Sequence, residues 1–271
     1  MPHSFRFSAL ANLLVLSHVV FAQTSCPEKF ISDASHVIGG AKHVLTSPAR
    51  WRGKDWALFG SVLAGTLALS YLDEPFDDLM QRNRSRLADD LTEVGIEYGE
   101  PRTVVVLTGG LYLTGLIADS EWLRESCVIA SASLLLGGII QSTTKVATGR
   151  ARPHVGLGHD EFDPFRGEEN YYSFFSGHTM VAMTMSHTLA RRIDHPAAKI
   201  ALYSLGAAGG LARTYNRDHW LTDVVLGNAM AIAGVNSVSK WLAAKQSGKE
   251  MGGVQWQLTP TSRSANLSFS W

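Results

Sequence analysis

The chain has 271 residues, which is enough for one large domain or two small ones. Lysine plus arginine and aspartate plus glutamate number 24 each, so the formal net charge is zero. This balance excludes the basic surface typical of nucleic-acid-binding proteins, and we expect no nucleic-acid partner. Charged residues make up only 18% of a chain that also holds 25 glycines, a composition that is unusual for a soluble enzyme.

Residues 1–22 have the features of a secretory signal peptide. Arg6 precedes an apolar run that ends at Val20-Phe21-Ala22, where small residues suit cleavage. An uncleaved N-terminal anchor is the alternative. Residues 23–54 follow as a polar lead-in segment, for which we predict one short helix.

Six apolar stretches of helical length follow, and together with the residues between them they define a predicted helical domain over residues 55–246. Each stretch is close to, or shorter than, the roughly 20 residues that cross a bilayer. We therefore predict an all-α bundle of about six core helices embedded in a membrane, with a soluble bundle as the alternative. Residues 73–101 are expected to form an amphipathic surface helix. The apolar stretches are 56–72, 103–118, 126–144, 174–190, 200–212 and 224–239.

The C-terminal tail, residues 247–271, differs from the helical domain in composition. Polar and apolar residues alternate in 254–258 and again in 265–271, as they do in strands. We predict a short β-hairpin, to which the sequence assigns no function.

The end of the third apolar stretch and the start of the fourth carry residues that could bind an anion. Lys145 and Arg152 close the third stretch, and Pro153 is expected to stop a helix there because the residue before a proline favours extended geometry. Ser176 and Gly177 open the fourth stretch. Such residues are favoured at a helix N-cap, where free backbone N–H groups and the helix dipole bind anions.

A further stretch carries a histidine and an aspartate four residues apart, His219 and Asp223, with Arg213 six residues upstream of the histidine. If one helix covers the pair, both side chains lie on the same face, and Asp223 can accept a hydrogen bond from one nitrogen of the imidazole. The other nitrogen is then available as a base or nucleophile. Taken alone, the pair could equally be a surface contact. With the other stretches, it indicates a site that holds a phosphoryl group and attacks its phosphorus.

These stretches resemble the three signature motifs of the type 2 phosphatidic acid phosphatase superfamily, which also includes bacterial non-specific acid phosphatases and vanadium haloperoxidases. The resemblance covers roughly residues 100–240. Phe175 and Ala212 depart from the commonest pattern, in which proline and serine stand there, but neither removes a charged or nucleophilic group. The motifs are Lys145-x6-Arg152-Pro153, Ser176-Gly177-His178 and Arg213-x5-His219-x3-Asp223.

The resemblance implies a role for each motif residue. His219 would attack phosphorus and form a phosphohistidine, Asp223 would orient it, and His178 would protonate the leaving oxygen and then activate water. The phosphate-binding residues would be Lys145, Arg152, Ser176, Gly177 and Arg213. No cofactor or metal is expected, although vanadate could bind as a mimic of phosphate.

The leading interpretation is therefore a metal-independent phosphatase acting on lipid phosphates such as phosphatidic acid or a polyprenyl diphosphate. The alternatives are a soluble periplasmic acid phosphatase acting on small phosphomonoesters, a vanadate-dependent haloperoxidase and a non-enzymatic membrane scaffold. If the signal is cleaved and all three stretches before Lys145 span the membrane, the site would lie on the cytoplasmic side. Cations near the segment ends opposite the motifs instead place the site outside the cytoplasm by the positive-inside rule, and we follow this second signal. We predict an exported protein of the inner membrane, with a soluble periplasmic protein as the alternative.

Overall fold

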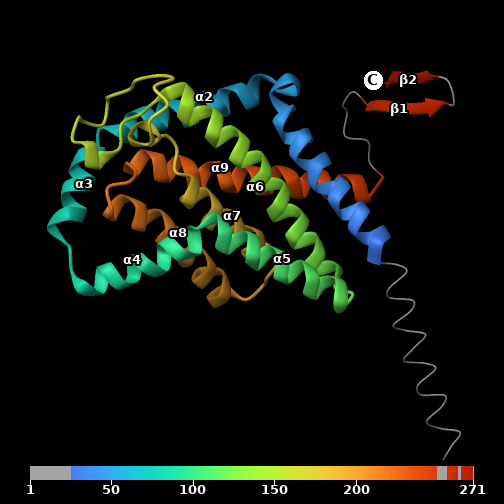
Figure 1. Cartoon of the computed structure of the whole chain (residues 1–271), viewed down its shortest axis with the longest axis horizontal. Helices are drawn as coiled ribbons and strands as arrows, with labels where there is room; N and C mark the ends of the chain where they lie inside the picture. The colour runs from blue at the N-terminus through green and yellow to red at the C-terminus, as the bar shows by residue number, and fades with distance from the viewer. Residues whose placement is uncertain (1–25, 249–254, 262–263, 271) are drawn as a thin grey trace, which may run out of the picture.

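The computed structural model describes residues 26–248, 255–261 and 264–270. Its main body is a bundle of helices (Figure 1), which confirms the predicted all-α class. The predicted hairpin is also present, with β1 (Gln255–Thr261) paired antiparallel to β2 (Ser264–Ser270). The predicted signal segment lies outside the described residues.

The six predicted apolar helices are confirmed as α2, α5, α6, α7, α8 and α9. A helix over residues 26–45 precedes them and is longer than the short helix expected in the lead-in segment. The remaining elements in chain order are η1 (Ser47–Arg50), α2 (Gly53–Ser70), α3 (Asp73–Arg82), α4 (Arg86–Gly99), α5 (Pro101–Ile117), α6 (Glu121–Thr148), η2 (Pro153–Val155), η3 (Glu169–Tyr171), α7 (Gly177–Ala190), α8 (Pro196–Tyr215) and α9 (Leu221–Gln246).

Two predicted boundaries were wrong. The single helix expected over residues 73–101 is broken into α3 and α4, because Ser85 takes an extended conformation and its hydroxyl caps α4 by accepting from the N–H of Ala88. The helix α6 ends at Gly149, four residues before Pro153. Gly149 adopts a left-handed conformation with φ of 55°, and a Cβ there would lie 1.8 Å from the carbonyl oxygen of Asp163.

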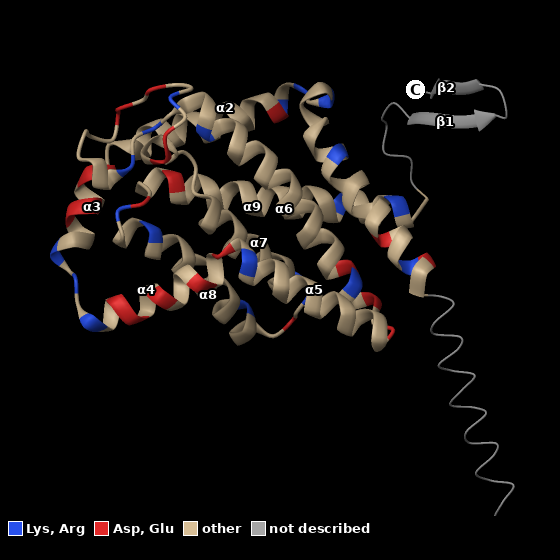
Figure 2. Ribbon diagram, viewed as in Figure 1, with Lys and Arg blue, Asp and Glu red and all other residues tan. Residues whose placement is uncertain are grey.

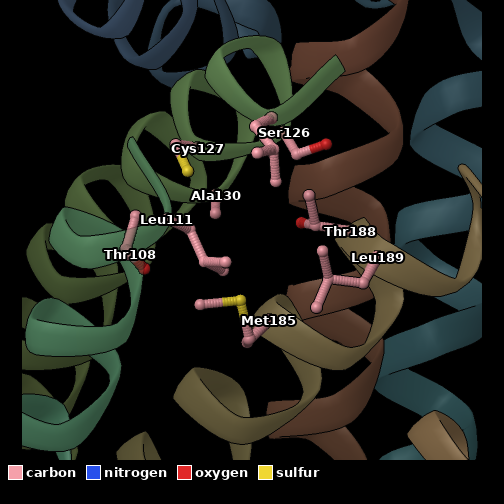
Figure 3. Close-up of a pocket in the computed structure, with 9 residues that line it drawn as sticks. Thr108, Leu111, Ser126, Cys127, Ala130, Met185, Thr188 and Leu189 are labelled. Carbon is pink, nitrogen blue, oxygen red and sulfur yellow. The ribbon is translucent and has the colours of Figure 1, made fainter. Parts of the chain in front are cut away.

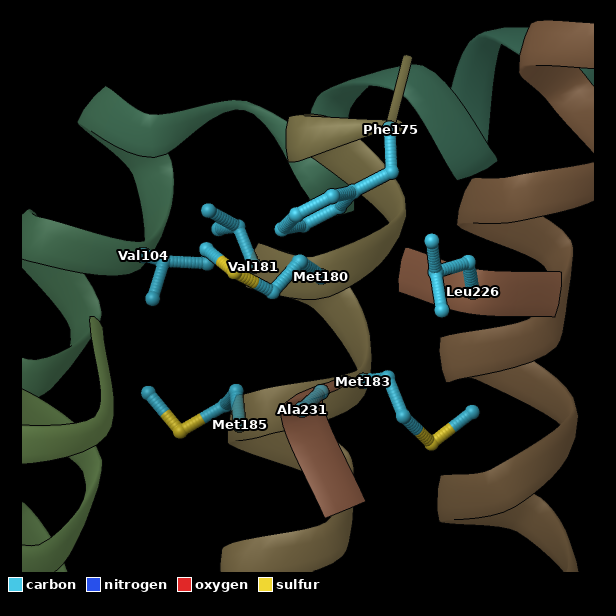
Figure 4. Packing of buried hydrophobic residues seen from close by; sticks show 8 residues of the cluster. All are labelled: Val104, Phe175, Met180, Val181, Met183, Met185, Leu226 and Ala231. Atoms are coloured by element: carbon cyan, nitrogen blue, oxygen red, sulfur yellow. The ribbon is translucent and has the colours of Figure 1, made fainter. Parts of the chain in front are cut away.

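The centre of the bundle is α7, most of whose residues are buried. It packs against α8, α9 and α6, and its methionines lie in an apolar cluster that includes Phe175 (Figure 4). Gly206 and Gly210 allow the close approach of α8, because a Cβ at Gly210 would lie 2.6 Å from Val224 and 3.0 Å from Thr179. These two glycines therefore let α7, α8 and α9 pack closely together.

The lengths and apolar composition of the helices are consistent with a membrane protein, but with fewer membrane spans than the six apolar stretches suggested. Among the described helices, α6 and α9 are long and apolar enough to cross a bilayer, and α2 with α3 forms a third candidate bent by 51°. The buried α7 has only 14 residues, which at about 1.5 Å per residue falls short of a bilayer core of about 30 Å. The structure thus supports membrane association with two or three spans.

A small cavity lies between α5, α6 and α7 (Figure 3). Its volume is about 10 Å³, and Leu111, Cys127 and Met185 are among its lining residues. Because this volume holds about one water molecule, the cavity is a packing defect rather than a ligand site.

Candidate active site

The direction of the helices brings the predicted site residues to one end of the bundle. Lys145 lies in the last turn of α6 and Arg213 in the last turn of α8. His178 and Asp223 lie in the first turns of α7 and α9. Since α6 and α8 end where α7 and α9 begin, residues about 80 positions apart in the sequence meet there (Figure 1).

His219 and Asp223 are brought together as predicted, but not by sharing one helix. His219 precedes α9, which begins at Leu221, and Trp220 is its extended N-cap. The pair meets because Asp223 folds back over this cap, where its carboxylate accepts from the Trp220 N–H at 3.0 Å. Nδ1 of His219 lies 3.8 Å from Oδ2 of Asp223, which is too long for the predicted hydrogen bond, and both side chains are buried. The Nε2 atom is therefore the one turned away from the carboxylate.

The carboxylate of Asp223 is held from several directions. Ser173 donates to Oδ2 at 2.5 Å, and Arg150 donates to Oδ1 at 2.8 Å. Because every donor fixes one oxygen, the carboxylate cannot rotate freely, and its orientation toward His219 is set by the surrounding structure.

Arg150 connects this carboxylate to a second buried acid. Its guanidinium donates to Asp73 at 2.7 Å, to the Thr222 hydroxyl at 2.8 Å and to the His159 carbonyl through two nitrogens. Asp73 is fully buried and also accepts from the Thr222 N–H at 2.8 Å. Arg150 is thus engaged within the protein and is not directed toward a substrate. The sequence motifs gave no signal for Asp73, which lies far from them at the start of α3.

The three predicted cations, which we call the cationic triad (Lys145, Arg152 and Arg213), lie close together. The charge of Lys145 interacts with those of Arg152 and Arg213. One carboxylate, Asp218, lies 3.5 Å from Arg152 and 3.2 Å from Arg213. The Nε atoms of both arginines are buried without a hydrogen-bond partner. The triad therefore retains donors that can bind an anion.

Burial determines the protonation of His219. Burial lowers the pKa of this imidazole to about 4, with the charges of Lys145 and Arg152 acting in the same direction, while Asp223 opposes the shift. The imidazole is therefore neutral at physiological pH, which is the form that has a free lone pair. The involvement of Lys145 and Arg152 also indicates that these two members of the triad lie near His219.

The start of α7 differs in one respect from what the sequence indicated. The backbone N–H of Ser176 donates to the carbonyl of Asp223 at 3.1 Å, so this N–H is not free to bind phosphate. The Ser176 hydroxyl accepts from Thr179 at 2.8 Å and keeps its own proton for donation. Gly177 is the first residue of α7, and a Cβ there would lie 2.6 Å from Nε2 of Gln141.

His178 has a partner that the motifs do not include. Its Nε2 lies 3.2 Å from Oε2 of Glu100, a residue at the junction of α4 and α5. The charges of Arg213 and Lys145 also act on His178, which places it beside the cationic triad. Among the residues that the structure describes, no group of three or more His, Cys, Asp or Glu is arranged to hold a metal ion.

A neutral histidine next to three cations suits the binding of a tetrahedral anion and attack on its central atom, which is the chemistry of a phosphoric ester hydrolase. The comparison with protein families agrees, because residues 126–247 match the PAP2 superfamily. This match includes all three motifs, and it confirms the resemblance seen in the sequence.

One solved structure supports the same fold, and a second is similar over more of the chain with a lower score. LpxE from Aquifex aeolicus is similar with a TM-score of 0.52 and 20% identity, covering 62% of this chain and 95% of that one. A transmembrane PAP2 type phosphatidylglycerolphosphate phosphatase from Bacillus subtilis has a TM-score of 0.48 and 18% identity, covering 74% of this chain and 100% of that one. The search of curated proteins found no match.

Proposed function

We propose that the protein is a metal-independent phosphatase that hydrolyses phosphate esters of lipids through a phosphohistidine intermediate. The observation that carries this proposal is the convergence of the His219–Asp223 pair with the cationic triad at one end of the bundle. Each side chain is of the type needed for its role, and each is positioned by the fold before substrate arrives.

In the first step, Nε2 of His219 attacks phosphorus while the bond to the leaving oxygen breaks. The cationic triad and the Ser176 hydroxyl bind the non-bridging oxygens and stabilise their charge in the transition state. Asp223 stabilises the positive charge that develops on the imidazole. His178 gives a proton to the leaving oxygen.

In the second step, water attacks the phosphohistidine. His178 takes a proton from this water, the bond between phosphorus and Nε2 breaks, and inorganic phosphate leaves. His219 returns to its neutral form and His178 to its protonated form, so the cycle closes without a metal ion.

An exposed apolar helix beside the site favours a lipid substrate. No residue of α2 is buried, and Leu58 and Leu67 are 66% and 70% exposed. The helix ends at Ser70, three residues before Asp73, whose carboxylate holds Arg150. A lipid that lies along α2 would therefore reach the site from the bilayer.

The charge distribution favours a site on the outer side of the membrane. All lysines and arginines of the helices are blue in Figure 2. Arg191 follows α7, and Lys240 and Lys245 lie near the end of α9, so these cations lie at the helix ends opposite to those that carry the site. By the positive-inside rule this end faces the cytoplasm and the site faces the exterior. An impermeant thiol reagent should label a cysteine introduced at Asp163 in intact cells but not one introduced at Lys199. The reverse pattern would overturn the orientation.

Purified protein in detergent, assayed with a chelator present, tests the proposed activity. We expect hydrolysis of long-chain phosphatidic acid well above that of glycerol 3-phosphate, loss of activity in His219→Ala, and retained activity in His195→Asn. His195 caps α8 away from the site, and asparagine is also a good N-cap. Rapid quenching with labelled substrate should give an acid-labile phosphoprotein. Unchanged activity of His219→Ala would refute the mechanism, and equal rates on both substrates would refute the lipid specificity.

A further inference from the structure

The residue that faces His178 lies at a rigid junction between two helices. Glu100 is the C-cap of α4 and the N-cap of α5, and Pro101 follows it at the first position of α5. Gly99 packs against the start of α7, because a Cβ there would lie 3.0 Å from the His178 carbonyl oxygen. The backbone on both sides of Glu100 is therefore fixed relative to His178.

The contact distinguishes the two nitrogens of the His178 imidazole. Nε2 faces the Glu100 carboxylate at 3.2 Å, and a carboxylate accepts hydrogen bonds but does not donate them. In neutral His178 the proton is therefore held on Nε2. Nδ1 is left as the nitrogen that can exchange a proton with a substrate.

We propose that Glu100 is a positioning residue that holds the Nε2 proton of His178 and assigns proton transfer to Nδ1. This inference rests on the proposed phosphatase function and adds a member to its site. In the first step the proton on Nδ1 passes to the leaving oxygen, and neutral His178 keeps the Nε2 proton bonded to Glu100. In the second step Nδ1 takes a proton from the attacking water. Glu100 itself remains ionised throughout.

The other charges around His178 show why a carboxylate is needed there. Burial lowers the pKa of the His178 imidazole, and the charges of Arg213 from α8 and Lys145 from α6 act in the same direction. Asp223 of α9 is engaged by Arg150, Ser173 and His219. From α5, Arg102 pairs with the other oxygen of Glu100 at 3.4 Å but is 92% exposed, so water screens its charge.

Glu97 of α4 accepts from Thr103 rather than from His178. Among these described groups, Glu100 is the acid that contacts His178 and stabilises its imidazolium.

The variant Glu100→Gln tests the inference, because glutamine can still accept from Nε2 but carries no charge. The matched control is Glu93→Gln, since Glu93 is an exposed acid on α4. Two substrates measure how much the reaction depends on proton donation by His178. The leaving group of an alkyl phosphate needs a proton, whereas that of p-nitrophenyl phosphate does not. We expect Glu100→Gln to lower kcat on the alkyl phosphate by roughly 10-fold or more and to change the aryl rate far less.

The pH profile supplies the second readout. Loss of an anion within hydrogen-bond reach should lower the pKa of the His178 imidazolium and move the alkaline limb of kcat/KM down by about one pH unit. If Glu100 only stabilised the fold, Glu100→Gln would lower the alkyl and aryl rates equally, change the unfolding midpoint and leave the alkaline limb of kcat/KM in place. That outcome would overturn the inference. If the unsubstituted protein hydrolyses neither ester, the proposed function fails instead.

Discussion

Replacing Arg150 with methionine should have a large effect, because it leaves two buried carboxylates without their shared cation. Arg150 lies 2.7 Å from Asp73 and 2.8 Å from Asp223, and the side chains of both acids are 0% exposed. At an effective dielectric constant of about 20 and a separation of about 4 Å, each attraction is about 4 kcal/mol. Much of this gain offsets the desolvation of the ions, so the measured loss for removing one partner should be about 3–5 kcal/mol.

Thermal unfolding in detergent provides the measurement. A loss of this size corresponds to a fall in the unfolding midpoint on the order of 10 °C for a chain of this length. Activity should fall on the order of 100-fold as well, because the Asp223 carboxylate would no longer be held in position beside His219. The control is Arg82→Met, since Arg82 pairs with Asp78 on the surface and its side chain is 78% exposed. This control should leave the midpoint nearly unchanged.

A second substitution separates charge from packing. Adding Asp73→Asn to Arg150→Met removes one of the two unpaired acids, so part of the lost stability should return, with a coupling free energy of about 1–3 kcal/mol. The assignment of Arg150 to a buried ionic network would be wrong if Arg150→Met were as stable as Arg82→Met. It would also be wrong if the double variant lost more stability than the two single variants lose when their losses are added.

Three further outcomes follow from the site. Asp223→Asn should lower kcat by roughly 10³-fold or more, and a loss below tenfold in the purified protein would contradict the role of its charge. Orthovanadate should inhibit competitively, and Arg213→Ala should weaken this inhibition; inhibition that is unaffected by the variant would place vanadate elsewhere. Because His219 has a pKa near 4, the acid limb of kcat/KM should fall near pH 4, and a limb near 6.5 would contradict its burial. Since the unfolded chain binds this proton at the ordinary value of 6.5, the contribution of His219 to stability is fully present above pH 6.5 and is lost as the pH falls toward 4.

The motifs, together with the family that they resemble, predicted which residues would form the candidate site. The motifs contain Lys145, Arg152, His178, His219 and Asp223, and the helix ends bring all of them together. The six apolar helices could likewise be predicted, because long uncharged stretches have few other stable conformations in this setting. The break at Ser85 and the left-handed Gly149 depend on local capping that competes with apolar patterning.

The supporting residues could not be predicted. Thr222 binds Asp73 across 149 positions, and His178 meets Glu100 across 78. No periodicity links residues so far apart, since only the packing of whole helices sets their distance. The N–H of Ser176 is a further example. The sequence indicated that it is free, but it donates to the carbonyl of Asp223 on a neighbouring helix, a contact that the sequence does not reveal.

In the proposed reaction, Asp218 would affect how the two arginines beside it release the product. Its carboxylate lies within 3.5 Å of both Arg152 and Arg213, so the protein itself supplies an acid that competes with phosphate for the same guanidinium groups. Cations without such a competitor would hold the released dianion tightly and slow each turnover. The Asp218 carboxylate would keep both arginines aligned and, by competing for them, would help phosphate to dissociate.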